Sequence, residues 1–201
     1  MSRSFALLLA AGVLLAGVGP TQRALGDTPT LAQAPPPDAA ARARQLDALF
    51  ARLKATRDEG EGAQVVSEIW KLWQSSGKPD LDARMEQAIR LMAHGLHQVA
   101  IGVLDDLIAR APDWAEAFNK RATVWFLIDE DTRSLADIER ALALEPRHFG
   151  ALAGRGLIYM RQDKDREALA AFRQAQAINP FLPERNGPIP ELEKKLGEKP
   201  I

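Results

Sequence analysis

Three prolines at a constant spacing constrain this chain more than any other feature. Pro112, Pro146 and Pro180 follow one another at intervals of 34 residues, and each ends an amphipathic run. Proline lacks a backbone N–H and clashes with the preceding helical turn, so each run is predicted to be a helix that stops there. A fixed period of this length indicates stacked helical units, because one helix pair cannot bury its apolar faces alone.

The prolines divide the chain into units at 81–114, 115–148 and 149–182, within which side-chain size recurs in register. Small residues occupy positions eight and twenty: Ala88, Ala122 and Gly156, then Ala100, Ser134 and Ala168. Bulky residues occupy positions eleven and twenty-four: Leu91, Trp125 and Tyr159, then Leu104, Ile138 and Phe172. Two antiparallel helices pack closely only where small side chains let their backbones approach. Each unit is therefore predicted to be a helical hairpin.

The third unit carries the most complete motif. Its residues are Leu152-x-x-Arg155-Gly156-x-x-Tyr159, then Ala168-x-x-x-Phe172, then Pro180. This pattern closely resembles the tetratricopeptide repeat (TPR) family, whose period is 34 residues. The leucine usual at position seven of that family is replaced in all three units, by Gln87, Arg121 and Arg155. The resemblance covers 81–182 and implies an all-α fold, a TPR-type α-solenoid of antiparallel helix pairs.

Both flanks carry patterns of helices that would cap the array. In 42–80, two apolar stripes at helical spacing predict a divergent N-terminal helical pair: Leu46, Leu49, Phe50 and Leu53, then Val66, Ile69, Trp70 and Trp73. Counting back by one period makes this pair a fourth, atypical unit. Downstream, 183–201 is predicted to be a C-terminal cap and tail. Its helix, 190–196, starts with a proline and ends before Gly197.

The first 26 residues have the features of an export signal. Arg3 precedes an uncharged run from Phe5 to Gly19, and this run of 15 residues is short of the roughly 20 that span a bilayer. Small residues at positions 24 and 26 predict a signal peptide at 1–26 that is cleaved before Asp27. Cleavage after Ala34 and an uncleaved membrane anchor are the alternatives. Residues 27–41 contain four prolines and are predicted to be an extended linker.

The composition excludes several classes of function. A net charge of −1 argues against a broadly cationic nucleic-acid binder. The absence of cysteine excludes disulfides, thiolate nucleophiles and Cys-ligated metals, and an exported chain without cysteine fits the bacterial periplasm. His94 and His97 fall in a predicted turn and would need a third ligand to hold zinc. His148 falls in a turn between units, where a structural or exposed position is expected.

No constellation of catalytic groups emerges from the sequence. The glycines at 150, 154 and 156 follow no strand and lack a Gly-Lys-Ser/Thr end, so they do not predict a phosphate-binding loop. Ser134 has no histidine partner in its own unit, and the acidic clusters lack the spacing of a calcium loop. We therefore expect no enzymatic activity, no cofactor and no metal.

The TPR resemblance implies a binding surface instead. In that family, positions two, five, nine, twelve and thirteen of the first helix of each unit line a concave groove. The predicted partner-binding groove residues are Met85, Ile89, Met92, Asn119, Thr123, Phe126, Leu157, Met160 and Arg161. The groove would be mainly apolar, with adaptable methionines and a polar centre at Asn119 and Thr123. The alternative is that these apolar side chains pack between helices or beneath the C-terminal tail.

The sequence thus predicts a non-enzymatic protein–protein interaction module in the periplasm. Its partner would be a peptide or helix of another protein held in the groove, and not a nucleic acid. A membrane would be involved only if the N-terminal segment stays uncleaved. The alternative function is that of a structural or self-associating subunit of a cell-envelope complex.

Overall fold

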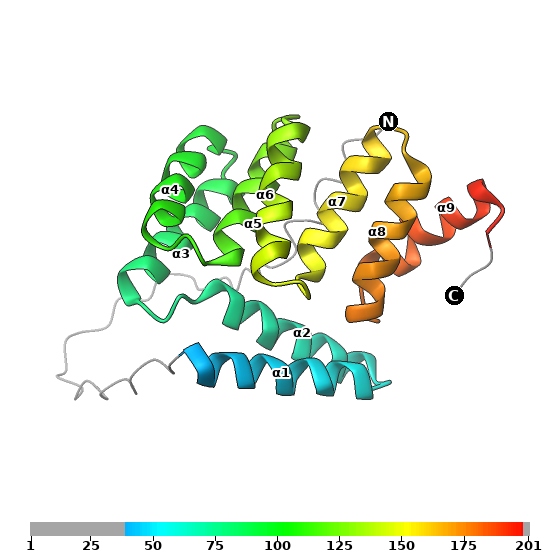
Figure 1. Ribbon diagram of the computed structural model, residues 1–201, viewed down its shortest axis with the longest axis horizontal. Helices are drawn as coiled ribbons and strands as arrows, with labels where there is room; N and C mark the ends of the chain where they lie inside the picture. The colour runs from blue at the N-terminus through cyan, green and yellow to red at the C-terminus, as the bar shows by residue number, and fades with distance from the viewer. Residues whose placement is uncertain (1–38, 199–201) are drawn as a thin grey trace, which may run out of the picture.

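The computed structural model describes residues 39–198, and Figure 1 shows this part of the chain as an array of helices with a separate pair beneath it. The helices are α1 (Ala39–Ala55), α2 (Glu59–Gln74), α3 (Pro79–Ala93), α4 (His97–Arg110), α5 (Ala115–Leu127), α6 (Asp131–Leu144), α7 (Phe149–Arg161), α8 (Asp165–Ile178), the short 3-10 helix η2 (Pro183–Asn186) and α9 (Pro188–Leu196). Residues 39–198 contain no strand. The predicted all-α TPR-type architecture is confirmed.

The sequence predicts a signal segment and a linker at the N-terminus, and the structure describes only the end of this region. The signal segment 1–26, both candidate cleavage points and the linker up to residue 38 lie outside the described residues. The predicted end of the linker at residue 41 is wrong, because α1 already begins at Ala39. Alanine has the highest helix propensity of all residues, so the alanines at 39–41 extend the helix backwards. Between residues 39 and 198, no helix is both long and apolar enough to cross a bilayer.

The three helix pairs, α3–α4, α5–α6 and α7–α8, are closely packed where the sequence places small residues. In the middle pair, the Ser134 hydroxyl donates a hydrogen bond of 2.7 Å to the carbonyl oxygen of Ala122. In the third pair, a Cβ atom at Gly156 would lie 2.6 Å from the ring of Phe172, so the ring packs directly on the glycine backbone. Positions eight, twenty and twenty-four therefore form the helix crossings, as the repeat pattern predicts.

The turn between the two helices of each pair also repeats. Position fifteen adopts a left-handed backbone in all three units, with φ of 71° at Gly95, 62° at Asp129 and 57° at Asp163. Glycine adopts this conformation without strain, and aspartate tolerates it better than most residues. The turn therefore has one geometry throughout the array, although its residue type changes.

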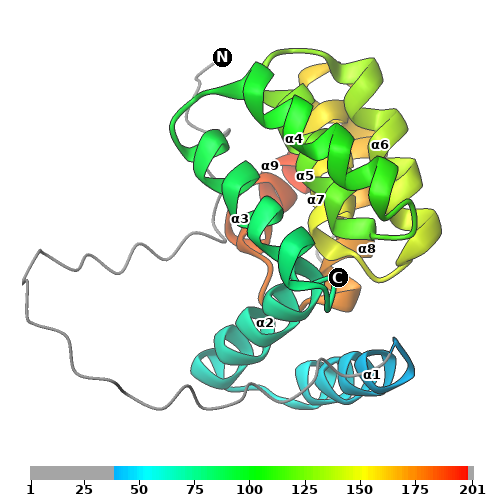
Figure 2. The same ribbon diagram turned by 90° about the vertical axis from the view of Figure 1, so that its left-hand side faces the viewer.

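The N-terminal pair, α1–α2, does not continue the array as a fourth unit, and this corrects the expectation from the 34-residue count. Figures 1 and 2 show it crossing below the stacked repeats, where α2 contacts α5. Its apolar stripes are used as predicted, since Leu53, Ile69 and Trp73 are buried. Trp73 packs against His148 and Phe149 at the start of α7.

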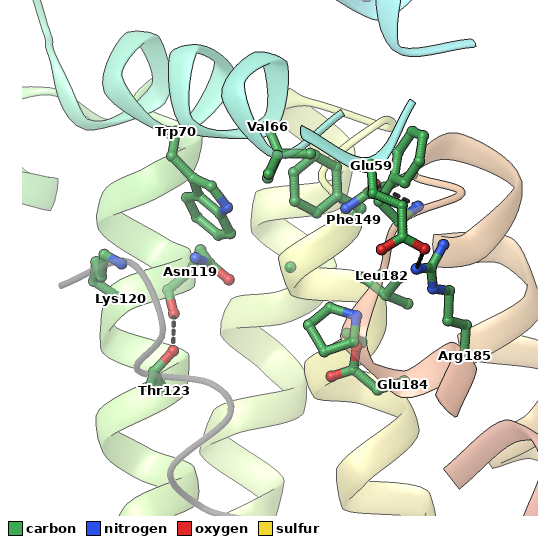
Figure 3. A pocket seen from close by; sticks show the side chains of 16 residues that line it. Glu59, Val66, Trp70, Asn119, Lys120, Thr123, Phe149, Leu182, Glu184 and Arg185 are labelled. Atoms are coloured by element: carbon green, nitrogen blue, oxygen red, sulfur yellow. Dashed lines mark hydrogen bonds and ion pairs between the residues drawn. The ribbon is translucent and has the colours of Figure 1, made fainter. Parts of the chain in front are cut away.

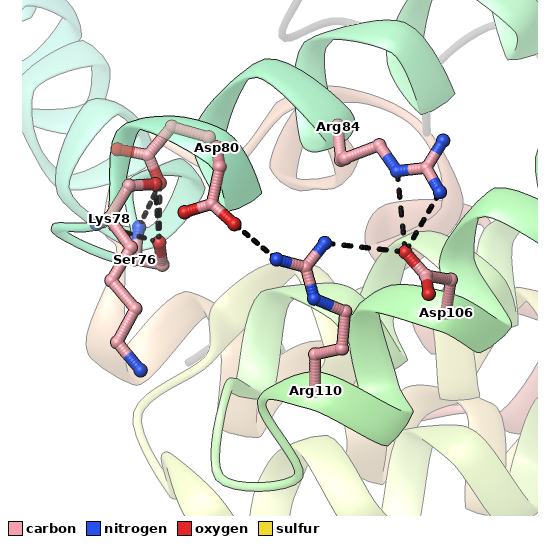
Figure 4. Close-up of polar contacts among 7 residues, drawn as sticks. Ser76, Lys78, Asp80, Arg84, Asp106 and Arg110 are labelled. Atoms are coloured by element: carbon pink, nitrogen blue, oxygen red, sulfur yellow. Dashed lines mark hydrogen bonds and ion pairs between the residues drawn. The ribbon is translucent and has the colours of Figure 1, made fainter.

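The change of direction occurs at the corner between α2 and α3. The Asp82 carboxylate accepts hydrogen bonds from the Ser75 hydroxyl at 2.8 Å and from the Ser76 hydroxyl at 2.7 Å. Gly77 follows with φ of 79°, a conformation that favours glycine. Figure 4 shows this corner beside the ion pair of Arg110 with Asp80, which joins α4 to α3, and the pair of Arg110 with Asp106 within α4. The Asp82 carboxylate thus ties the first turn of α3 to the segment that follows α2.

The C-terminal helix α9 covers the last repeat. It begins at Pro188, two residues before the predicted start, and ends at Gly197, whose φ is 68°. Leu192 is buried in the same core as α8, and Glu193 pairs with Arg173 of α8 at 3.0 Å. The capping role predicted for this segment is therefore observed.

Candidate functional site

The first helices of the repeats, α3, α5 and α7, are neighbours and form one face of the array. The N-terminal pair lies across the N-terminal halves of α5 and α7, and two tryptophans of α2 make the contact. Trp73 stacks on His148 with ring centroids 4.1 Å apart, and Trp70 meets Phe149 edge-on at 5.5 Å. The indole N–H of Trp114 donates to the Trp73 carbonyl oxygen at 2.7 Å. This half of the face is consequently covered by the chain's own helix.

Two glycines allow α2 to approach this closely. A Cβ atom at Gly62 of α2 would lie 2.5 Å from the ring of Phe181, which follows α8. A Cβ atom at Gly150 of α7 would lie 2.6 Å from the ring of Trp70. The sequence does not predict a phosphate-binding loop at Gly150, and the neighbours of Gly150 show that it serves helix packing.

A buried polar cluster lies beneath the tryptophans. The Glu116 carboxylate is completely buried, where its Oε1 lies 3.1 Å from Lys120 Nζ and its Oε2 lies 2.9 Å from His148 Nε2. The Asn119 amide N–H donates to the same Oε2 at 2.9 Å. Burial alone would raise the pKa of Glu116, but the charges and hydrogen bonds of Lys120 and His148 outweigh it and leave the pKa below its usual range.

Sequence reasoning missed most of this cluster. The sequence predicts a turn at His148, with a structural or exposed side chain. The structure shows His148 fully buried as the cap of α7, with its Nδ1 accepting from the Ala151 N–H at 3.2 Å. No motif in the sequence points to Lys120. The spacing of four residues between Glu116 and Lys120 was the available signal, since such residues are neighbours on a helix surface.

The predicted groove residues fall into two groups by exposure. Five of the nine are buried: Met85, Asn119, Thr123, Phe126 and Leu157. Phe126 is 9% exposed, and the Arg161 guanidinium lies 4.0 Å from its ring centroid. Thr123 donates its hydroxyl hydrogen to the Asn119 carbonyl oxygen at 2.9 Å. These five side chains form the floor of the face and the contacts between its helices.

The other four predicted residues are partly or fully exposed, and they lie near the C-terminal ends of two first helices. They are Ile89 and Met92 of α3, and Met160 and Arg161 of α7. We call these four residues the open groove. Arg161 is held over Phe126 by Asp129, whose Oδ1 lies 2.7 Å from Nη1, and by a further ion pair with Asp131. The array thus leaves three apolar side chains partly exposed on α3 and α7, and a fixed cation on α7, near the helix ends that α2 does not cover.

The half of the face that α2 covers also contains a cavity. A cavity of about 330 Å³ lies between α2, α5, α7 and the segment 179–185, and Figure 3 shows its lining. Sequence reasoning missed this cavity, because its walls come from parts of the chain that no repeat register relates.

The histidine pair, His94 and His97, lies where α3 ends and α4 begins. Throughout the part of the chain that the structure describes, no three His, Asp or Glu side chains converge in a way that could hold a metal ion.

Comparison with known proteins agrees with this architecture. No protein-family model matches the chain. A TPR repeat-containing protein of Rhizobium etli is 36% identical over 137 residues, which are 68% of this chain and 67% of that protein. Anaphase-promoting complex subunit 7 of Dictyostelium discoideum is 33% identical over 73 residues, 36% of this chain and 13% of its own length.

Among solved structures, the MamA protein superimposes with a TM-score of 0.53 at 19% identity, over 77% of this chain and 84% of MamA. This likeness shows the shared solenoid fold. The Rhizobium etli protein is related closely enough, and over enough of its length, to establish the family. The chain belongs to the TPR repeat-containing proteins.

Proposed function

We propose that this protein is an exported, non-enzymatic module that binds a peptide or helix of a partner protein at the open groove. The observation that carries this proposal is the partial exposure of Ile89, Met92 and Met160 at positions nine and twelve of the first helices, whereas five of the nine predicted groove residues are buried. Methionine is unbranched and polarizable, so it adapts to different apolar partners. The TPR-type fold itself is one that supports protein–protein interaction.

The covered half of the face limits the size of that partner. Because α2 already lies on α5 and α7 near Asn119 and Phe149, a partner segment would contact only the C-terminal halves of the first helices. Arg161 lies beside Met160 and is already paired with two aspartates. We therefore expect it to orient a bound partner segment and to attract an acidic segment only weakly. The partner segment is thus expected to be short and mainly apolar.

Site-specific photo-crosslinking tests the location. A photoreactive side chain at Met92 or Met160 should crosslink the same segment of one partner in the native host. The matched control is Ala136, which is exposed on the second helix of the middle repeat. Crosslinks from Ala136 and none from Met160 would place the partner on the outer face and reject the open groove.

The location in the periplasm is part of the same proposal. It rests on the uncharged run from Phe5 to Gly19 and the small residues before Asp27. Mass spectrometry of the native protein from a periplasmic extract should show a chain that begins at Asp27. An intact Met1 start in a soluble cytoplasmic fraction would refute export.

A second candidate function is self-association as a subunit of an envelope complex. Two large apolar side chains are exposed at the start of α4, Leu96 at 50% and Val99 at 55%. They belong to the first repeat, which the N-terminal pair does not cap. If this face joins copies of the chain, Leu96→Ser with Val99→Ser should convert an oligomer to a monomer in light scattering. A wild-type monomer would exclude this candidate.

A further inference from the structure

The cavity under α2 has two facing walls of different origin. Figure 3 shows Asn119, Lys120 and Thr123 of α5 on one wall, with Glu184 and Arg185 on the other. Its volume of about 330 Å³ lies at the lower end of the range of small-ligand pockets. The cavity is separate from the open groove, so an inference about it goes beyond the proposed function.

The charged groups around this cavity are paired, with one exception. Lys120 pairs with Glu116, and Arg185 Nη2 lies 2.7 Å from Glu59 Oε1 at the exposed rim. Glu184 is 5% exposed, and its Oε2 has no hydrogen-bond donor among the described residues. Among the charged side chains that line the cavity, Glu184 is thus the one without an ion pair in residues 39–198, and burial raises the pKa of Glu184 above its usual range.

The remaining side chains that line the cavity suit a ligand with an aliphatic chain and a cationic group at its end. Aromatic and small apolar side chains make up most of it: Ala63, Val66, Trp70, Phe149, Ala153 and Phe181. Aromatic faces attract cations, and methylene groups pack against apolar walls. A buried carboxylate is stabilised by a hydrogen-bonded cation and destabilised by a second anion. Phosphate and carboxylate ligands are therefore disfavoured here.

We propose that this cavity binds a primary ammonium group, with Glu184 as its counter-ion. The ammonium N–H would donate to the Glu184 carboxylate, and the aliphatic stem would lie against the ring of Trp70. A lysine side chain of a partner protein and a free alkylamine share this chemistry. Because α2 and the segment 179–185 both contribute walls, a bound ligand would also stabilise the docked position of the N-terminal pair.

Calorimetric titration of the purified protein tests the proposal with three probes: n-butylamine, N-acetyl-lysine methylamide and the neutral n-butanol. Both amines should bind, butanol should not, and the indole N–H resonance of Trp70 should shift. Glu184→Gln should weaken amine binding about tenfold or more, because a hydrogen bond between charged groups is lost. The matched control is Glu191→Gln, at an exposed acidic position in the first turn of α9.

Each remaining outcome decides the question. Tighter binding of the lysine amide identifies a protein side chain as the ligand, and tighter binding of butylamine identifies a free amine. Equal binding to wild type and Glu184→Gln, butanol binding as tight as butylamine, or no amine binding at millimolar concentration would each overturn the proposal. Ala63→Leu is a second variant, at an exposed lining position of α2, and should weaken amine binding by narrowing the cavity. Crosslinking at the open groove is independent of all these results.

Discussion

The imidazole of His148 lies parallel to the indole of Trp73, with ring centroids 4.1 Å apart and planes inclined by 10°. His148 also caps α7 through Ala151 and faces the carboxylate of Glu116. One buried ring therefore connects the N-terminal pair, a helix start and the buried polar cluster. It follows that α1–α2 is part of the folded unit and not an appended segment.

The docking of α2 can be disturbed at Gly62 without touching that ring. Gly62→Leu should push α2 away from Phe181, because even a Cβ atom there would lie 2.5 Å from the ring. Hydrogen exchange in α1 and α2 should become faster, whereas α5 to α8 should keep their protection. Gly102→Leu is the control, since a Cβ atom at Gly102 meets nothing within 4 Å. An unchanged exchange pattern in Gly62→Leu would contradict the close contact.

The crossing of α7 and α8 makes a second prediction. Gly156→Ala should destabilise the protein by about 1–3 kcal/mol, because the new methyl group would meet the fully buried ring of Phe172. Gly102→Ala, on the exposed side of α4, should instead stabilise it by about 0.5–1 kcal/mol through helix propensity. Urea unfolding measures both. The predicted register fails if Gly156→Ala also stabilises.

The repeats were predictable from the sequence because their signal is local and occurs three times. Small residues such as Ala122 and Gly156 mark the crossings, and the prolines mark the helix ends. The position of α1–α2 was not predictable in this way. It depends on contacts between Trp73 and His148 and on the corner at Asp82, and no periodicity encodes these contacts.

The sequence predicted which residues lie on the groove side of the array, but not which of them are exposed. The register identified which residues face the groove side, including Phe126 and Met160. It could not show that Arg161 lies over Phe126 or that α2 covers half the face, because both depend on tertiary contacts. Glu184 lies in a segment between α8 and α9 where no motif points to a function. Glu184 stands out because its Oε2 is buried and no group among the described residues donates a hydrogen bond to it, and a sequence does not reveal this.

The turns offer a prediction about backbone strain. Asp163 has φ of 57°, and Asp163→Gly would relieve the cost of about 1–2 kcal/mol for a left-handed residue with a Cβ atom. The greater unfolded-state entropy of glycine offsets about 0.4–1 kcal/mol of this gain. Thermal unfolding should therefore show a small net stabilisation, and Asp163→Ala should show none. A lower melting temperature for Asp163→Gly would mean that its carboxylate makes a contribution larger than the strain.

The buried cluster around Glu116 predicts how stability depends on pH. Glu116→Gln leaves Lys120 and His148 without their carboxylate and should cost about 3–5 kcal/mol at neutral pH. Glu86→Gln is the matched control, because Glu86 also precedes a basic partner, Arg90, by four residues, but on the surface. Glu86→Gln should lower the unfolding free energy by only about 0.3–0.5 kcal/mol.

A lower pH should reduce the difference in unfolding free energy between the wild type and Glu116→Gln. The pKa of Glu116 is lower in the folded protein than in the unfolded chain, so the unfolded state binds more protons as the pH falls. The stability contributed by its charge is thus present above the ordinary glutamate pKa of about 4.3 and is lost as the pH falls through the lower folded value. Denaturant titrations from pH 7 into the acid range should show the two unfolding free energies converging. A difference that stays constant with pH would mean that Glu116 acts through packing and not through its charge.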